Sequence, residues 1–158
     1  MDVDIAMRPE AVDLVTCEGG TAWSKHDILT HIAKLFGTVY GVDDAEILDG
    51  LEQREALDST GFGRGIAIPH CRTAQVNRPT LVLLKLDTPC NFEAADAMPV
   101  RLIFGLVSPQ NAGSTHLRAL AAISRIMRDD AMIQALLEAA DGEAMYALLT
   151  NQILRDAA

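Results

Sequence analysis

The chain has 158 residues, of which 49% are hydrophobic and 22% charged, a composition ordinary for one globular domain with a substantial core. Its net charge of −9 argues against a nucleic-acid partner, because phosphate backbones require a cationic protein surface. No stretch reaches the roughly 18 unbroken apolar residues of a membrane helix, so we expect no membrane insertion.

The N-terminal sequence, MDVDIAMRPEAVDLV, is acidic and lacks the basic region and apolar run of a secretory signal. A cytoplasmic location is therefore expected. We expect a single domain over residues 1–158, with residues 1–12 as a loose leader. The three cysteines are odd in number and lack metal-ligand spacing, so they favour a reducing compartment and indicate no metal site.

The first predicted helix covers residues 24–37, SKHDILTHIAKLFG. Ser24 is a plausible N-cap, Asp27 follows three residues later as in a capping box, and Gly37 can close the end. Two histidines, His26 and His31, lie inside this helix near lysines, which is typical of solvated helix residues.

A second helix is predicted within residues 42–59, with Asp43 or Asp44 as its cap and an apolar face that includes Ile47. Arg54 lies near the end of this helix. A cation there can simply offset the helix dipole, and this reading stays open beside a functional one.

Strands are predicted after the glycine-rich segment STGFGRG, and helices follow the strands. The strands cover residues 65–70, 80–87 and 99–109, and the helices begin near residues 114, 131 and 142. The order of helices, strands and helices predicts an α/β or α+β domain whose sheet is covered by helices.

His70 stands where the first strand, GIAIPH, ends. Pro69 before it has a fixed backbone angle and no amide hydrogen. The imidazole ring of His70 therefore lies at a rigid point where the chain leaves the strand. The glycines of residues 61–65 allow backbone amides to face an anion, although they can equally form a mobile loop. The segment is no P-loop, because no lysine follows the last glycine. A structural hydrogen-bonding role for His70 stays open.

His116 falls in the first turn of a helix that begins near Ser114 or Thr115. Helix N-termini favour phosphate and lower the pKa of a nearby histidine, which keeps the imidazole neutral. Attack on phosphorus requires a neutral imidazole with a free lone pair. Thr115 can cap the helix or bind an anion. Cys71, next to His70 on an extended segment, points to the opposite face and is poorly placed to use His70 as a base.

Three segments together resemble the enzyme IIA proteins of the bacterial phosphoenolpyruvate-dependent phosphotransferase system. They read REALDSTGFGRGIAIPHC, TPCNFEAADAMPVRLIFGLVSP and STHLRALAAISRIMRD. The similarity is to the fructose/mannitol class, most closely to its nitrogen-regulatory branch, and runs from about residue 12 to about residue 152. It implies an α/β fold, a single domain with a mixed β-sheet flanked by helices.

The resemblance implies that His70 accepts a phosphoryl group from a histidine phosphocarrier protein (HPr-like). By the same resemblance His116 supports that group by hydrogen bonding and Arg54 lies near the active site. We expect phosphate binding around Ser59, Thr60, Gly61 and Thr115. No cofactor or metal is expected. Many relatives have glycine where this chain has Cys71, which leaves local flexibility and redox sensitivity open.

The expected activity is that of a phosphotransferase acting mainly in regulation of the nitrogen/potassium type, with targets such as potassium transporters or sensor kinases. The alternative is a sugar-specific, fructose/mannitol-type enzyme IIA that passes phosphate to a membrane permease component. A docking rim for the phosphocarrier is expected from Phe62, Ile66 and Leu117, each of which can equally be core.

Overall fold

The computed structural model describes residues 4–111 and 113–157, with side chains as far as residue 152. A six-stranded sheet has the order β1-β5-β6-β3-β2, and β4 pairs with β6. The strands are β1 Val12–Val15, β2 Gly61–Gly63, β3 Ile66–Ala67, β4 His70–Thr73, β5 Thr80–Cys90 and β6 Val100–Pro109. The helices are α1 Lys25–Tyr40, α2 Asp44–Leu57, α3 Gly113–Arg128, α4 Asp130–Glu138 and α5 Gly142–Ala157, with short 3-10 turns at Pro9–Ala11 and Glu18–Gly20.

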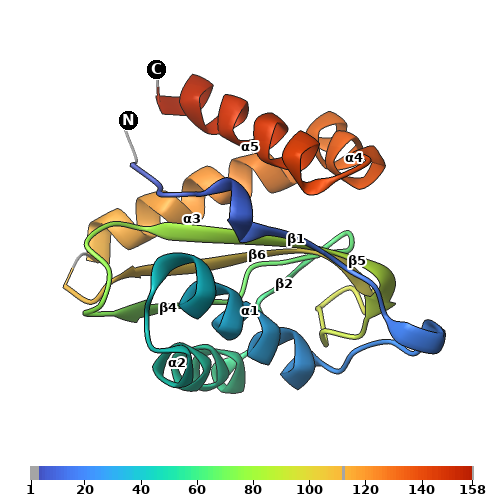
Figure 1. Ribbon diagram of the computed structural model, residues 1–158, viewed down its shortest axis with the longest axis horizontal. Helices are drawn as coiled ribbons and strands as arrows, with labels where there is room; N and C mark the ends of the chain where they lie inside the picture. Colours follow the sequence, from blue (N-terminus) through green and yellow to red (C-terminus); the bar gives the residue numbers. More distant parts are fainter. Residues whose placement is uncertain (1–3, 112, 158) are drawn as a thin grey trace.

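The sheet is mixed and is covered by helices on both faces. β5 and β6 run antiparallel, whereas β1 is parallel to β5 and both β3 and β4 are parallel to β6. Helices α1 and α2 cover one face, and α3, α4 and α5 cover the other (Figure 1). The expected mixed sheet flanked by helices is confirmed. Within the described residues no helix has both the length and the apolar character needed to cross a bilayer.

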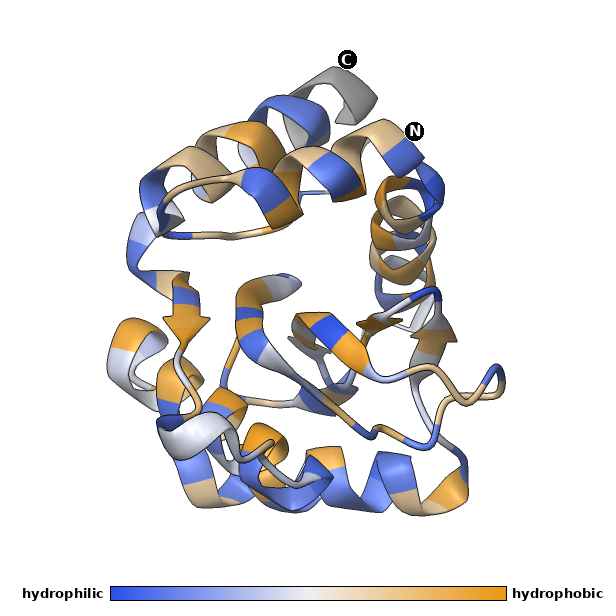
Figure 2. Cartoon of the chain, turned by 90° about the vertical axis from the view of Figure 1, so that its right-hand side faces the viewer, coloured by the Kyte–Doolittle hydropathy of each residue, from blue (hydrophilic) through white to orange (hydrophobic). Residues whose placement is uncertain are grey.

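Two hydrophobic cores lie on the two faces of the sheet. Side chains alternate along a strand, so β5 sends Val82 and Leu84 into the core under α1 and α2 and Leu81 and Leu83 into the core under α3 to α5. Hydrophobic residues recur along the helices between hydrophilic ones, as expected for elements with one buried face (Figure 2).

The predicted N-caps of the first two helices are confirmed. Ser24 and Asp27 form a capping box at α1, and Asp43 is the N-cap of α2. The predicted C-terminus of α1 at Gly37 was wrong. The helix continues to Tyr40 and ends at Gly41, whose φ of 73° supplies the left-handed conformation that closes many helices.

The predicted strand over residues 65–70 is divided into β3 and β4. The break falls at Ile68 and Pro69: the Ile68 amide donates to the Thr60 carbonyl, just before β2, and Pro69 has no amide hydrogen to donate. Upstream, the glycine-rich segment forms β2 and a tight turn to β3. Gly63, Arg64 and Gly65 all have positive φ, which explains the glycines on either side of Arg64.

The expectation of a loose leader over residues 1–12 was wrong for the described part of that segment. Ala6 forms a bridge with Thr80, Ala11 is fully buried and β1 already begins at Val12. Apolar residues such as Met7 pack against the core under α3 to α5, and this burial fixes the segment on the sheet. Residues 1–3 lie outside the described residues.

Candidate functional site

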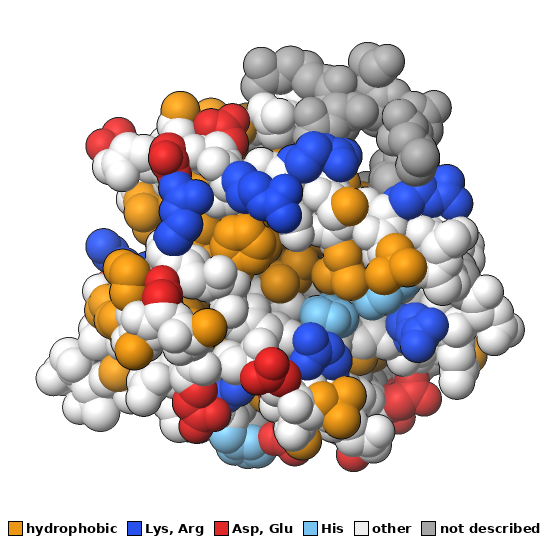
Figure 3. Space-filling view, turned by 180° about the vertical axis from the view of Figure 1, so that it is seen from behind, with side chains coloured by type: hydrophobic (Ala, Val, Ile, Leu, Met, Phe, Trp, Pro, Cys, Tyr) orange, Lys and Arg blue, Asp and Glu red, His pale blue; other side chains and the backbone are white. Residues whose placement is uncertain are grey.

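An open pocket of about 770 Å³ lies where β4 passes between α2 and α3. Its lining comprises Gly50, Gln53, Arg54 and Leu57 from α2, His70, Cys71 and Arg72 from β4, Gln110, and His116, Leu117 and Leu120 from α3. The space-filling view shows histidine side chains at the surface beside basic and hydrophobic ones (Figure 3). Two of the four histidines thus meet in one pocket, although 46 positions separate them in the chain (116 − 70).

His70 is the first residue of β4 and is half-buried. Its Nδ1 lies 2.7 Å from the Ile68 carbonyl oxygen, and because that oxygen can only accept, Nδ1 carries the hydrogen. The other ring nitrogen, Nε2, therefore holds the lone pair in the neutral ring. Burial lowers the pKa of His70, and the charge of Arg54 lowers it further, while the bond to Ile68 acts in the opposite direction.

His116 lies in the first turn of α3 and is buried. Its Nδ1 is 2.7 Å from the Ser108 hydroxyl at the end of β6. Desolvation by burial lowers the pKa of His116 to about 4, with smaller contributions from His70 and Arg72. Burial thus favours the neutral imidazole, in the same direction as the helix terminus that the sequence suggested.

The two imidazoles face each other across the pocket with ring centroids 5.5 Å apart. A small tetrahedral group attached to one ring lies within reach of a hydrogen bond from the other at this separation. Both rings are held from behind, one by a backbone carbonyl and the other by a serine hydroxyl, so their orientations are defined before any ligand binds.

Two arginines contribute positive charge to the pocket. Arg54 comes from α2, and its Nη1 donates to the Asp58 carbonyl at 2.9 Å, which draws the side chain along the end of that helix. Arg72 comes from β4, two residues after His70. The lining contains no Asp or Glu, so an anion entering the pocket meets positive charge and neutral rings only.

The structure does not bring Ser59, Thr60, Gly61 or Thr115 into the lining of this pocket. The Ser59 hydroxyl donates to the Phe92 carbonyl and accepts from the Gly61 amide. The Thr60 hydroxyl donates to the carboxylate of Glu55, which also accepts from the Thr60 amide. These polar groups hold the turn after α2 to its neighbours.

Sequence reasoning missed Arg72 and Ser108. The alternation of side chains along an extended segment could have found Arg72, because residues 70 and 72 share one face of a strand. The same rule correctly placed Cys71 on the other face, where its sulfur lies 3.9 Å from the Ile47 carbonyl and burial raises its pKa to about 12. Nothing local to Ser108 signals its contact with His116.

The expected docking rim is only partly present at this pocket. Leu117 is 66% exposed and lies in the lining, as does Leu57, which is 81% exposed. For Ile66 the core alternative holds, because it is 1% exposed and lies in the core under α3 to α5. Phe62 is partly buried against the same core.

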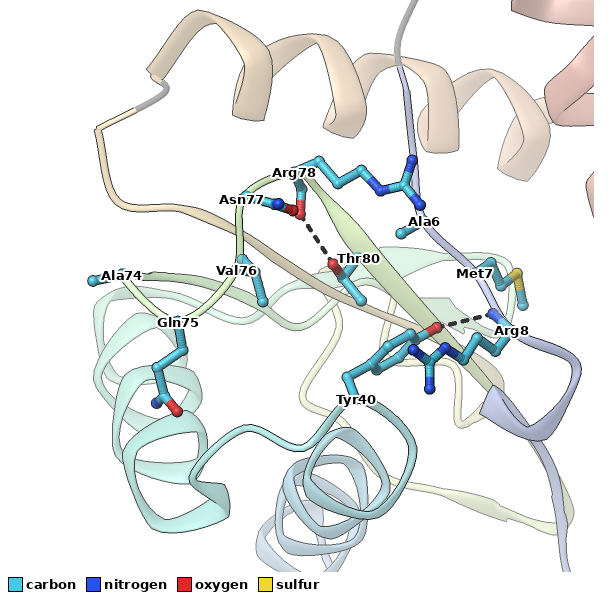
Figure 4. A pocket seen from close by; sticks show the side chains of 10 residues that line it. All are labelled: Ala6, Met7, Arg8, Tyr40, Ala74, Gln75, Val76, Asn77, Arg78 and Thr80. Atoms are coloured by element: carbon cyan, nitrogen blue, oxygen red, sulfur yellow. Dashed lines mark hydrogen bonds between the residues drawn. The ribbon is translucent and has the colours of Figure 1, made fainter.

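A second pocket, of about 410 Å³, has basic residues whose hydrogen bonds are already made within the protein. The Arg8 side chain donates to the Val39 carbonyl. Its backbone amide donates to the Tyr40 hydroxyl (Figure 4). Arg78 pairs with Asp4. The pocket with the two histidines is therefore the better candidate for chemistry. Among the residues that the structure describes, no cluster of three or more His, Cys, Asp or Glu side chains could hold a metal ion.

Comparison with known proteins identifies the relatives of this chain. A nitrogen regulatory protein of Pseudomonas aeruginosa is 39% identical over 139 residues, covering 87% of this chain and 88% of that protein. A fructose-specific EIIA component of Haloferax volcanii is 30% identical over 97% of this chain and 99% of its own length. The crystal structure of the nitrogen regulatory protein IIA-Ntr from Neisseria meningitidis superposes with a TM-score of 0.80 at 29% identity, covering 90% of this chain and 95% of the other.

The sequence pattern of one family, described as "Phosphoenolpyruvate-dependent sugar phosphotransferase system, EIIA 2", matches residues 11–152. The match includes every strand, α1 to α4 and most of α5, and with them both histidines of the pocket. On this match and these identities, the chain belongs to the EIIA 2 family of the phosphoenolpyruvate-dependent sugar phosphotransferase system.

Proposed function

We propose that this protein is a phosphoryl carrier that accepts a phosphoryl group on His70 from a histidine phosphocarrier protein and acts mainly in regulation. The observation that carries the proposal is the pairing of two neutral imidazoles in one open pocket, with Nδ1 of His70 already bound to the Ile68 carbonyl. Membership in a phosphotransferase-system family supports the same activity.

The reacting atom is Nε2 of His70. Its lone pair attacks phosphorus while the bond between phosphorus and the donor's imidazole nitrogen breaks, and the electron pair of that bond returns to the donor ring. Nδ1 of His70 keeps its hydrogen throughout and continues to donate to Ile68. A ring fixed in this way reacts without first losing rotational freedom.

Two groups, His116 and Arg54, stabilise the transferred phosphoryl group. When the Ser108 hydroxyl donates to Nδ1 of His116, Nε2 of His116 carries the hydrogen and donates it to a phosphoryl oxygen. Arg54 supplies positive charge from α2. Phosphoryl transfer passes through a loose transition state in which positioning and charge stabilisation dominate, and removing one preorganised donor typically costs roughly 10²–10³ in rate.

The residues first expected to bind phosphate have a supporting role in this proposal. Arg54 and Glu55 are neighbours on α2, and they bind Asp58 and Thr60 respectively. Thr60 in turn accepts from the Ile68 amide, two residues before His70. Ser59, Thr60 and Gly61 thereby position the segment that carries His70. Thr115 lies in the first turn of α3, outside the lining.

Regulation is favoured by the relatives named nitrogen regulatory protein. For this chain we propose a cytoplasmic location and regulated targets such as potassium transporters or sensor kinases. The second candidate, phosphate delivery to a sugar permease component, is favoured by the fructose-specific relative that matches almost the full chain.

The test of the transfer step uses phosphoenolpyruvate, enzyme I and a phosphocarrier protein. Wild type should gain one acid-labile, base-stable phosphoryl group, and His70→Ala should gain none. His26→Ala is the matched control, because His26 is exposed on α1 and neither it nor its partner Glu52 lines the pocket. Label retained by His70→Ala would remove His70 from the nucleophile role. Identical partners captured by the phosphorylated and unphosphorylated forms would argue against a regulatory switch.

A further inference from the structure

Arg72 occupies the same face of β4 as His70. Cys71, between them, turns its sulfur toward α2, as its contact with the Ile47 carbonyl and its close approach to Gly50 establish. Residues 70 and 72 then point together to the other side, and both line the pocket.

The strand register also places Arg72 beside the group that holds His116. β4 runs parallel to β6 with Arg72 opposite Ser108, whose hydroxyl contacts the His116 ring. At the start of α3, the Arg72 guanidinium lies 4.0 Å from the position that a Cβ of Gly113 would occupy. Arg72 therefore reaches from the sheet to the helix turn that carries His116.

Arg72 is solvent-exposed and lines the pocket close to the first turn of α3. The first turn of a helix has unpaired amides and positive partial charge, which disfavours a nearby cation. No carboxylate is present in the pocket lining, and within the described residues Arg72 forms no ion pair. The charge of Arg72 also disfavours protonation of His116. Positive groups thus converge on a pocket whose lining holds no carboxylate.

We infer that Arg72 is a further phosphoryl-binding residue of this site, donating from its guanidinium to the oxygens of the group carried on Nε2 of His70. The inference rests on the proposed function for the identity of that group. A guanidinium suits the role because it presents paired N–H donors in the geometry of two phosphate oxygens and stays charged at any physiological pH. Arg54 from α2, Arg72 from β4 and His116 from α3 then contact the phosphoryl group from three separate elements.

The first experiment measures single-turnover phosphoryl transfer from the phosphocarrier to wild type, Arg72→Gln and Arg72→Lys. We expect Arg72→Gln to slow transfer by about 10²–10³-fold, as for other preorganised donors, and Arg72→Lys to recover part of the loss. Arg118→Gln is the matched control, because Arg118 is exposed on the same turn of α3, bonds to Ser114 and does not line the pocket. Its rate should equal that of wild type. Arg72→Gln reacting at the wild-type rate would overturn the inference.

The second experiment uses inorganic phosphate and the unphosphorylated protein, so that the role of Arg72 is tested apart from covalent transfer. The imidazole resonances of His70 and His116 should shift on titration with phosphate, and Arg72→Gln should weaken the affinity by about 10- to 100-fold. If wild type accepts no phosphoryl group but binds phosphate through Arg72, the transfer proposal fails, and what stands of the inference is that Arg72 binds a phosphate anion in this pocket. Equal affinities, or no shift in wild type, would overturn the inference.

Discussion

The chemistry of the site depends on where two protons reside on two imidazole rings. His70 keeps its hydrogen on Nδ1 because a carbonyl oxygen faces that atom, and His116 stays neutral because it is buried. A protonated ring at either position would remove a lone pair or add a positive charge beside two arginines. Burial and the arginine charges therefore act together to keep both rings neutral at physiological pH, while the Ile68 carbonyl fixes which nitrogen of His70 carries the hydrogen.

We predict that His116 in the unphosphorylated protein is half-protonated near pH 4, since burial lowers its pKa to about 4 from an ordinary value of 6.5. In the unfolded chain the ring binds a proton below its ordinary pKa. The unfolded state therefore binds more protons than the folded state between the two values, and stability falls as the pH decreases from about 6.5 to about 4. Histidine-selective NMR, with His116→Gln to assign the signal, measures the pKa.

The stability side of this prediction is checked by urea denaturation at pH 7 and at pH 5. His116→Gln should lose less stability than wild type over that interval, because glutamine does not titrate. A His116 signal that titrates near pH 6.5, together with equal pH dependence in the two proteins, would contradict the assignment of a buried, neutral ring.

At the scale of residues, the sequence predicted the groups that have local signals and missed those that depend on tertiary contacts. His70, His116 and Arg54 all line the pocket. Phosphate binding was expected at Thr60 because it lies in the glycine-rich segment, but Glu55 binds its hydroxyl. Ser108 reaches His116 only because β6 and α3 pack together. Its role could not be read from neighbouring residues.

At the scale of elements, a single lysine of β5 binds the carbonyl groups at the C-terminal end of α4. Lys85 points from β5 toward the helical layer of α3 to α5, and its Nζ lies 2.7 Å from the Ala139 carbonyl, 3.1 Å from that of Leu137 and 3.2 Å from that of Leu136. The last carbonyls of a helix lack intrahelical partners, and a cation is favourable at this negative end of the dipole. Lys85 therefore fastens α4 to the centre of the sheet.

We predict that Lys85→Met lowers the free energy of unfolding by about 1.5–3 kcal/mol, the usual range for hydrogen bonds to a charged group. Methionine keeps an unbranched apolar stem, so the change isolates the ammonium group. Lys34→Met on the exposed side of α1 is the control and should leave stability unchanged. Urea denaturation measures both variants, and equal midpoints for wild type and Lys85→Met would show that the three contacts add nothing.

The sequence predicted the elements that have long apolar patterns but not the short strands β1 and β2. The central strands β5 and β6 and all five helices agree with the sequence patterns, although α1 extends beyond Gly37. β1 has four residues and β2 has three, two of them glycines, too few for a recognisable alternation. Both are strands because they pair with longer neighbours, which is a tertiary effect.

At the scale of the whole molecule, the two central strands belong to both cores. β6 sends Ile103 and Val107 toward α1 and α2, and Phe104 and Leu106 toward α3 to α5. The pocket draws on the same three layers, with Arg54 from one helical layer, His70 from the sheet and His116 from the other. A loss of packing on either face must therefore disturb the sheet that both faces share, which supports our proposal that the chain is a single domain.

We predict that the protein unfolds as one cooperative unit. A substitution that destabilises one core should therefore lower the unfolding midpoint of the other core by the same amount. Leu149 is fully buried in the core under α3 to α5, and Leu149→Ala should cost about 2–5 kcal/mol. The only tryptophan, Trp23, packs against the opposite core and lies 5.1 Å from the His31 ring, so its fluorescence reports that face. In urea, the midpoint followed by Trp23 should shift as far as the midpoint followed by far-ultraviolet circular dichroism. A Trp23 transition that stays at its wild-type midpoint would mean that the two faces unfold separately, and the chain would then be two folding units joined at the sheet.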